Sequence, residues 1–222
     1  MHIVYNIGIL VLAYLIGSIP TSVWIGRSVF GIDVRERGSK NAGATNAMRV
    51  FGWKVGLTVL IIDMLKGWLA VNLIHLTNYY IPETGDFIEF QLLLGIAAIL
   101  GHIFPVYVGF RGGKGVATLF GLILAINPEP TLLCVGIFAI TLVVTKYVSL
   151  SSMVAGFAFP VMVIFVFKTT TPSLVIFSLI IAGLLLFTHQ KNIERLLRRE
   201  EKKVLFLMSK RRRETERLKQ SA

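Results

Sequence analysis

Long runs of apolar residues alternate with short polar segments along this chain of 222 residues. A run of about 20 apolar residues is long enough for a helix that crosses a lipid bilayer. The pattern therefore predicts an all-α integral membrane protein with seven transmembrane helices. The apolar runs fall at about residues 3–25, 53–76, 88–108, 115–126, 131–145, 150–167 and 173–188.

The run over 115–126 is the shortest, because the sequence "NPEP" follows it directly. Two arrangements stay open for this part of the chain. In the first, "NPEP" is a tight turn between two short helices that are packed inside the protein, and the number of spans is seven. In the second, the segment 115–145 is a re-entrant hairpin and the number of spans is five.

Basic residues gather in the segments that both arrangements place on one side of the membrane. The polar segment 26–52 holds five Lys or Arg residues, and the tail from residue 189 holds twelve. The opposite loops contain several acidic residues and only Lys168 as a base. Because Lys and Arg are enriched in cytoplasmic loops, we expect the N-terminus outside and the C-terminus in the cytoplasm. No basic residue precedes the first apolar run, so we expect an uncleaved helix rather than a signal peptide.

The composition limits the kinds of partner and site. Apolar residues make up 55% of the chain and the formal net charge is +11. In a membrane protein such charge mainly reports topology, so we expect no nucleic-acid partner. Cys134 is the single cysteine, and the four histidines are scattered, so we expect neither an intramolecular disulfide nor a metal site. We predict one membrane domain over 1–198 and a basic cytoplasmic tail over 199–222, lying near anionic lipid.

The first polar segment contains the sequence "GSKNAGATNAMR". Its glycines let the backbone approach a ligand, and its neutral polar side chains offer hydrogen bonds. Together with two cationic side chains, this composition suits a phosphate group. A flexible turn with helix caps is the alternative, since Gly, Asn and Ser are also common turn residues. The candidate phosphate-binding residues here are Ser39, Lys40, Asn41, Thr45, Asn46 and Arg49.

A glycine-rich sequence opens the apolar run at 115. The residues Gly112, Gly113, Lys114 and Gly115 bring backbone amides and a lysine to the positive end of a predicted helix. The sequence is not a Walker A loop, because the glycine and the Ser or Thr of that motif are missing. Anion binding and a tight turn with a lysine that reaches the membrane surface both stay open.

Three further groups of residues are candidates for chemistry. Serines 149, 151 and 152 precede an apolar run, where they are helix N-caps by default but could also hold a phosphate. His189 and Asn192 are three residues apart and share a helix face. Asp63 and Lys66 have the same spacing inside an apolar helix, so they can form an ion pair within the membrane.

The candidate residues are small, neutral-polar or cationic, and all the candidate loops lie on the predicted cytoplasmic side. We find no G-x-S-x-G nucleophile motif in the sequence. An anionic substrate that carries an acyl chain would suit such loops beside apolar helices. An organic-anion transporter and a non-catalytic lipid-binding scaffold are the alternatives, although transporters bind near the bilayer midplane and often contain repeats.

Six sequences together resemble the bacterial acyl-phosphate:glycerol-3-phosphate acyltransferases, and they occur in the same order over residues 17–196. They are "GSIPTS", "GSKNAGATNAMR", "DMLKG", "LGHIFPVYVGFRGGKG", "KYVSLSS" and "HQKNIERL". The resemblance implies a seven-helix protein of the bacterial inner membrane whose active site faces the cytoplasm. It also implies transfer of a fatty acyl group from acyl phosphate to the 1-hydroxyl of glycerol 3-phosphate, which gives lysophosphatidic acid and phosphate. Neither a metal nor another cofactor is implied.

The resemblance also assigns roles to the candidate residues. It implies that the residues essential for catalysis are Ser39, Arg49, His189 and Asn192. It implies that the glycine-rich loop, including Lys114, is the glycerol 3-phosphate and phosphate site. With the residues argued from composition, the candidate phosphate- and substrate-binding residues are Lys40, Asn41, Thr45, Asn46, Gly112, Gly113, Lys114, Gly115, Ser151 and Ser152. We expect Asp63, Lys66, His102 and Arg111 to support the site. Besides the two substrates, membrane lipids and the enzyme that makes acyl phosphate are candidate partners.

Overall fold

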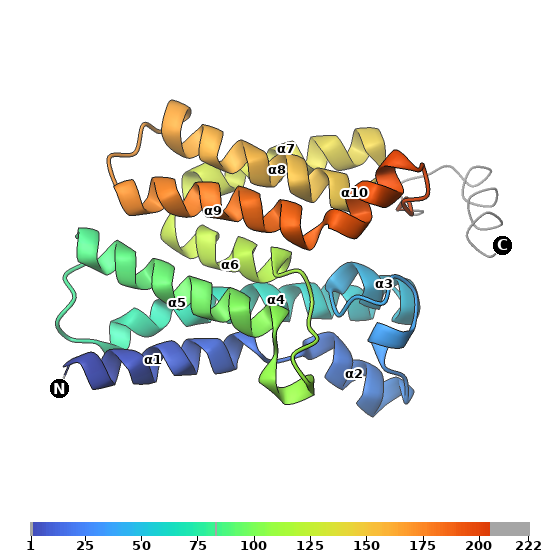
Figure 1. Ribbon diagram of the computed structural model, residues 1–222, viewed down its shortest axis with the longest axis horizontal. Coiled ribbons are helices and arrows are strands. Elements are labelled where there is room, and N and C mark those ends of the chain that lie inside the picture. The colour runs from blue at the N-terminus through green and yellow to red at the C-terminus, as the bar shows by residue number, and fades with distance from the viewer. Residues whose placement is uncertain (1, 83, 205–222) are drawn as a thin grey trace. The chain divides into compact units, whose positions relative to one another are not determined.

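The computed structural model describes residues 2–82 and 84–204, and within these residues the regular structure is helical. The contacts divide the chain into two compact units, Met1–Glu129 and Pro130–Ala222. Most of the predicted basic tail over 199–222 lies outside the described residues. The α-helices are α1 (His2–Gly17), α2 (Thr21–Phe30), α3 (Ala44–Phe51), α4 (Trp53–Asn72), α5 (Gly85–Ile103), α6 (Val116–Ile126), α7 (Pro128–Thr145), α8 (Val148–Val161), α9 (Pro172–Thr188) and α10 (Gln190–Leu197) (Figure 1).

Four continuous helical segments in the described residues are long and apolar enough to cross a membrane, and two bent helix pairs raise this number to six. The continuous segments are Trp53–Leu76, Gly85–Val108, Pro128–Thr145 and Val148–Val166. Helix α6 is apolar but shorter. An all-helical membrane protein is thus confirmed, whereas the count of seven spans and their orientation stay predictions.

One bend lies inside the first apolar run, and a second directly follows the last one. The first run bends by 43° between α1 and α2, where Pro20 cannot donate a backbone hydrogen bond. The last run ends with α9, and the chain then bends by 60° into the polar helix α10, with His189 at the break. Each bend ends an apolar helix next to residues that the sequence analysis singled out.

Small residues let pairs of helices in the first unit approach closely. A side chain at Gly67 of α4 would meet the carbonyl of Thr118 in α6, and one at Gly121 of α6 would meet the carbonyl of Met64. Helices α1 and α5 pack in the same reciprocal way through Gly17 and Gly101. Close backbone approach at small residues is the usual basis of helix packing inside membranes.

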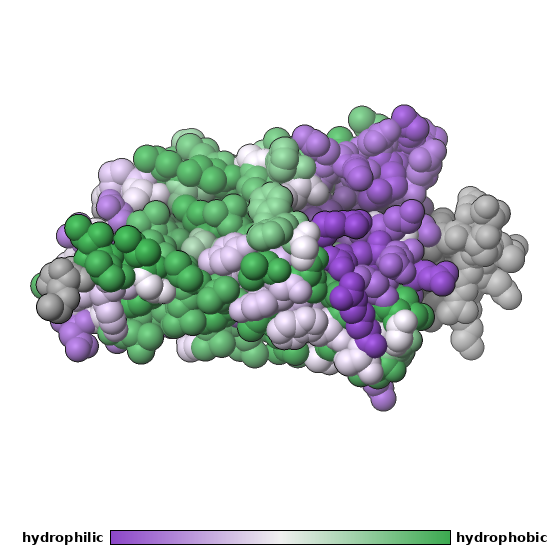
Figure 2. All heavy atoms as spheres, turned by 60° about the horizontal axis from the view of Figure 1, so that its bottom comes forward, coloured by the Kyte–Doolittle hydropathy of each residue, from purple (hydrophilic) through white to green (hydrophobic). Residues whose placement is uncertain are grey.

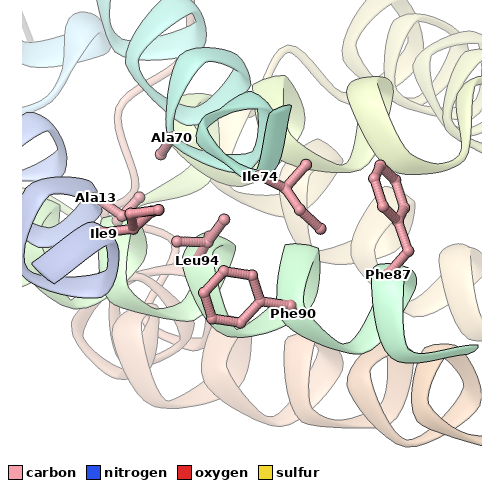
Figure 3. Packing of buried hydrophobic residues seen from close by; sticks show 8 residues of the cluster. Ile9, Ala13, Ala70, Ile74, Phe87, Phe90 and Leu94 are labelled. Atoms are coloured by element: carbon pink, nitrogen blue, oxygen red, sulfur yellow. The ribbon is translucent and has the colours of Figure 1, made fainter. Parts of the chain in front are cut away.

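Apolar side chains fill the space where α1, α4 and α5 meet. The cluster includes Ile9 of α1, Ala70 of α4 and Leu94 of α5 (Figure 3). By contrast, Ile3, Val4 and other large apolar side chains on the outside of α1 are exposed, as expected of a surface that faces lipid. Figure 2 shows this hydrophobic surface along α1 and hydrophilic residues gathered near α2.

The second unit consists of α7, α8, α9 and α10 (Figure 1). Gly156 of α8 brings that helix against the side chain of Leu185 in α9. Pro160 lies inside α8, and the helix ends in a π-helical turn over Met162–Val166. A proline removes one helical hydrogen bond, which explains the wider turn that follows it.

Candidate active site

The side chain of Asn46 organises the first candidate loop. Its amide nitrogen lies within 2.9 to 3.0 Å of the carbonyl oxygens of Val34, Arg37 and Asn41. Its amide oxygen accepts the backbone N–H of Ser39 at 2.8 Å. Asn46 is only 1% exposed, so the loop folds around this one side chain. Its contacts favour a positioning role for Asn46 over direct contact with a substrate.

The loop around Asn46 presents the other predicted polar residues outward. The side chains of Ser39, Lys40, Thr45 and Arg49 belong to exposed residues, and Asn41 is half-buried. Gly38 must be small and left-handed here, because its φ is +61° and a Cβ would strike the Asn46 side chain. The loop is thus a defined structure with exposed cationic and hydroxyl groups, not merely a flexible turn.

A half-buried arginine joins this loop to the glycine-rich loop. Arg35 binds the carboxylate of Asp33 through Nε and Nη2, and its Nη1 donates to the carbonyls of Val108 and Arg111, both at 2.9 Å. A hydrogen bond from Arg35, with a further one from Arg27, holds the pKa of Asp33 well below its ordinary value despite partial burial. The same carboxylate raises the pKa of Arg35. From the sequence alone, Arg35 was expected only to contribute to the charge that indicates topology.

The glycine-rich loop folds back on the end of α5. The backbone N–H of Gly112 donates to Ile103 at 3.0 Å, and that of Gly113 donates to His102 at 3.1 Å. A side chain on Gly112 would meet the His102 carbonyl, and one on Gly113 would meet the His102 ring. These two amides are therefore used inside the protein, and the glycines are needed for close packing. Lys114 and Gly115 follow at the start of α6.

A buried polar network lies beneath the glycine-rich loop. Lys66 Nζ is 2.9 Å from Asp63 Oδ1, which confirms the predicted ion pair. Lys66 also donates to the carbonyl of Ile19 at 2.9 Å, and Thr21 donates to Asp63 at 3.1 Å. His102 Nδ1 lies 3.0 Å from Thr118 Oγ1. The same His102 nitrogen lies 3.9 Å from Asp63 Oδ1, so polar groups of α2, α4, α5 and α6 lie together within an apolar unit.

A small pocket brings these parts of the first unit together. Ala42 from the first loop, Gly112 and Gly113 from the second loop, and Asp63 and Lys66 from the network all contribute to its wall. The carbonyl of Ala42 is held by a hydrogen bond from Ser22 at 2.8 Å. Two loops that are about 70 residues apart in the sequence thus meet above one buried ion pair.

In the second unit, Glu201 binds three polar side chains, and two of them, Ser149 and Asn192, were candidates from the sequence. Its carboxylate accepts hydrogen bonds from Ser149 at 2.7 Å, Asn192 at 2.6 Å and Arg195 at 2.7 Å. Burial alone would raise the pKa of Glu201, but these donors lower it below the ordinary value. The sequence analysis missed Glu201, which lies beyond the end of α10.

The serines of α8 do not cap that helix. Tyr147 occupies the N-cap position and makes no capping bond with its side chain. Ser151 and Ser152 donate instead to the carbonyls of Tyr147 and Val148, one helical turn earlier. The default interpretation of these serines as N-caps is therefore wrong. Such back-bonding satisfies a hydroxyl inside an apolar helix.

His189 lies at the bend between α9 and α10 and is 2% exposed. Its Nδ1 is 2.9 Å from the carbonyl of Leu185. A carbonyl can only accept, so Nδ1 carries the proton and the neutral ring has its lone pair on Nε2. Glu194 pairs with Arg198 at 2.8 Å rather than with His189. No cluster of three or more metal-binding side chains occurs in the part of the chain that the structure describes.

Comparison with known proteins decides the family. The family model described as glycerol-3-phosphate acyltransferase matches residues 7–199. The chain belongs to the glycerol-3-phosphate acyltransferase family. Its relatives in this family include the glycerol-3-phosphate acyltransferases of Chlorobium phaeobacteroides (strain BS1) and Chlorobium limicola, each 40% identical. The alignments cover 89% and 90% of this chain and 96% and 97% of those proteins.

Two solved structures of a family member resemble the fold. Both are of PlsY (YgiH), an integral membrane glycerol 3-phosphate acyltransferase, and both are 31% identical to this chain. The glycerol 3-phosphate form superposes with a TM-score of 0.80 and the lysophosphatidic acid form with 0.77. The matches cover 90% of this chain and 96% and 95% of those chains. Membership of the acyltransferase family and a membrane location are thus established.

Proposed function

We propose that this acyltransferase moves a fatty acyl group from acyl phosphate to the 1-hydroxyl of glycerol 3-phosphate, releasing lysophosphatidic acid and inorganic phosphate. We place it in the bacterial inner membrane as a seven-span protein with the N-terminus outside and the active site facing the cytoplasm. The relatives' names and the two ligand forms of PlsY support the acceptor and product. The sequence resemblance supports the donor, the position of acylation and the orientation.

The observation that carries this proposal is the meeting of two cationic loops above the pocket of the first unit. The loop around Asn46 exposes Ser39, Lys40 and Arg49, and the glycine-rich loop leads into Lys114. Both substrates are anions, so a reaction between them requires cationic groups that offset their mutual repulsion. We assign the phosphate groups to these two loops, with Asn41, Thr45 and Gly115 as further contacts.

The roles proposed for residues of the second unit rest on the sequence resemblance. We assign His189 and Asn192 to the reacting hydroxyl of glycerol 3-phosphate and Ser151 and Ser152 to a phosphate group. The hydroxyl groups of Ser151 and Ser152 donate to the backbone carbonyls of Tyr147 and Val148. Each hydroxyl must therefore rotate away from its carbonyl before it can donate to an anion. Asn192 is already held by Glu201 through its amide nitrogen.

The proposed reaction is a direct acyl transfer. The 1-hydroxyl oxygen attacks the carbonyl carbon of acyl phosphate and forms the ester bond. The bond from that carbon to the phosphate oxygen breaks, and phosphate leaves with its electron pair. The hydroxyl proton passes either to Nε2 of His189 or to a phosphate oxygen of the substrate. Because acyl phosphate is already activated, holding the two anions close and stabilising the developing charge are the protein's main contributions.

The donor is tested by supplying purified protein with glycerol 3-phosphate and one acyl donor at a time. We expect lysophosphatidic acid to form with acyl phosphate and not with acyl-CoA or acyl carrier protein. The product is measured with radiolabelled glycerol 3-phosphate, and protein in which Lys114 is replaced by Met is the control for a non-enzymatic reaction. Product formation from acyl-CoA but not from acyl phosphate would overturn the proposed donor.

The role of His189 is tested separately. As a general base, it contributes about 10² to 10⁴ to the rate, so His189→Gln should reduce turnover by at least 100-fold. His75→Gln is the matched control, because His75 is exposed and its ring lies beside that of Phe87. If His189→Gln retained nearly complete turnover, His189 would be excluded as the base, and the substrate's phosphate would be the proton acceptor.

A further inference from the structure

The side chain of Arg35 connects the two loops to which we assign the substrates. We propose that Arg35 is a positioning residue of the acyl transfer, whose guanidinium, bound to Asp33, holds the loop of Ser39 and the loop of Lys114 at one separation. This inference rests on the proposed function for the roles of the two loops. The contacts of Arg35 itself belong to the first unit and do not depend on those roles.

The geometry of the connection requires an arginine. Nε and Nη2 face the two oxygens of Asp33 at 3.0 and 2.8 Å, while Nη1 donates to the carbonyls of Val108 and Arg111. The planar guanidinium carries its donors in a rigid fork, so one side can bind a carboxylate while the other binds a turn. A lysine has one flexible ammonium and cannot span both partners in this way. The Arg35 side chain is 11% exposed, which limits screening by water.

The turn that Arg35 holds is strained. Gly109 and Phe110 are both left-handed, with φ of +70° and +58°. A residue such as Phe rarely adopts this conformation, which persists only where surrounding contacts hold it. The bonds from Nη1 to Val108 and Arg111 lie on either side of this strained pair. Gly112, Gly113 and Lys114 follow directly, so the position of this turn sets where the glycine-rich loop begins.

The other end of the connection reaches Ser39 through Asn46. Arg35 lies in the short turn Val34–Glu36, and the carbonyl of Val34 accepts from the Asn46 side chain at 2.9 Å. Asn46 in turn holds the backbone N–H of Ser39. A continuous path of hydrogen bonds and short backbone segments therefore runs from the Arg111 carbonyl to Ser39. No atom on this path needs to touch a substrate.

A change at Arg35 should therefore act on the alignment of two bound substrates. Each loop keeps its own local structure, because Asn46 still organises the first and the amides of Gly112 and Gly113 still anchor the second. Affinity for each substrate should change little. A misplacement of about 1 Å between reacting groups can lower the rate by about 10²-fold, so the turnover number should carry most of the effect.

The test compares Arg35→Lys and Arg35→Gln with Arg27→Gln in purified full-length protein. Arg27 is the matched control, since it binds the same Asp33 carboxylate at 2.9 Å but its side chain is 57% exposed. We expect Arg35→Gln to lower kcat by ten- to a hundred-fold and to change KM for glycerol 3-phosphate and for acyl phosphate by less than threefold. Arg35→Lys should recover little of the loss, and Arg27→Gln should retain nearly full turnover.

Three kinds of result would overturn the role proposed for Arg35. Equal effects of Arg35→Gln and Arg27→Gln would show that only the charge near Asp33 matters. Full activity of Arg35→Lys, or a change in KM alone, would exclude control of alignment by the guanidinium. Failure of both Arg35 variants to fold, measured by thermal unfolding in detergent, would reduce Arg35 to a structural role. Inactive wild-type protein would instead reject the proposed function.

Discussion

At the scale of single residues, several polar side chains with little exposure are held by hydrogen bonds to other groups of the protein. Asn46, Glu201 and the pair of Asp63 and Lys66 each bind at least two partners inside an otherwise apolar chain. Burying such groups is unfavourable unless their hydrogen bonds are made. Their loss should therefore be measurable as lower stability, even where no substrate is present.

We expect Glu201→Gln to lower the free energy of unfolding by about 1.5–3 kcal/mol at pH 7, because an amide cannot accept from all three of its donors. The pKa of Glu201 in the folded protein is below its ordinary value of 4.5. Its stabilising contribution is thus fully present above pH 4.5 and is lost as the pH falls through the folded pKa. The midpoint of thermal unfolding, followed against pH in detergent, should depend less on acid pH in the variant. The exposed neighbour Glu200, changed to Gln, should leave this profile unaltered.

Removing one partner of the buried ion pair should be more harmful than removing both. Asp63→Asn or Lys66→Met alone leaves an uncompensated buried charge or acceptor, which costs about 3–5 kcal/mol. The double variant should lose clearly less than the sum of the single losses. Denaturant unfolding of the four proteins measures the coupling, and strictly additive losses would refute it.

At the scale of elements, glycines decide how closely the helices pack. Helices α4 and α6 meet through Gly67 and Gly121, and α1 and α5 meet through Gly17 and Gly101. Each of these glycines faces a backbone carbonyl of the partner helix. A flexible side chain can move aside, but a carbonyl inside a helix cannot do so without moving the helix.

Gly67→Ala should therefore destabilise the protein by about 1–3 kcal/mol, as overpacking of a tight site usually does. Gly8→Ala is the matched control in the same unit, because a Cβ there has no neighbour within 4 Å. That change should be neutral or should stabilise helix α1, by up to about 1 kcal/mol. Equal unfolding midpoints for the two variants would contradict the importance of the α4 and α6 contact.

The sequence was most informative where spacing along one helix determines a contact. The pair of Asp63 and Lys66 follows from residues three apart in an apolar helix. The contacts of Arg35 with Val108 and Arg111 were not predictable in this way, since 73 and 76 residues separate the partners. Glu201 was missed because it lies outside any helix, and only the fold brings it to Ser149. The bend at Pro20 likewise divides a run that is continuous in hydropathy.

At the scale of the whole molecule, basic residues remain the basis for the predicted orientation. The segment between α2 and α3 contains Arg35, Arg37 and Lys40, whereas the first turn of α5 contains the acidic residue Asp86. Lys and Arg near membrane spans favour the cytoplasmic side. Helix lengths cannot distinguish one orientation from the other, so labelling in cells is required.

The single cysteine makes such labelling straightforward. Cys134 is buried and can be changed to Ser, after which Asp86→Cys and Glu36→Cys each introduce one exposed position. A membrane-impermeant maleimide should label Asp86→Cys in intact cells, and Glu36→Cys only after permeabilisation. The reverse pattern would invert the proposed topology, and labelling of both in intact cells would refute their placement on opposite sides.

The shortness of α6 has a consequence for how a lipid and a water-soluble metabolite can meet. Its 11 residues extend for about 17 Å, whereas the hydrocarbon layer is about 30 Å thick. In the proposed seven-span arrangement, an α6 that crosses the membrane would therefore have at least one end within the hydrocarbon layer. In the proposed reaction, a polar substrate that reached this end would meet the acyl chains without the lipid donor being lifted out of its leaflet.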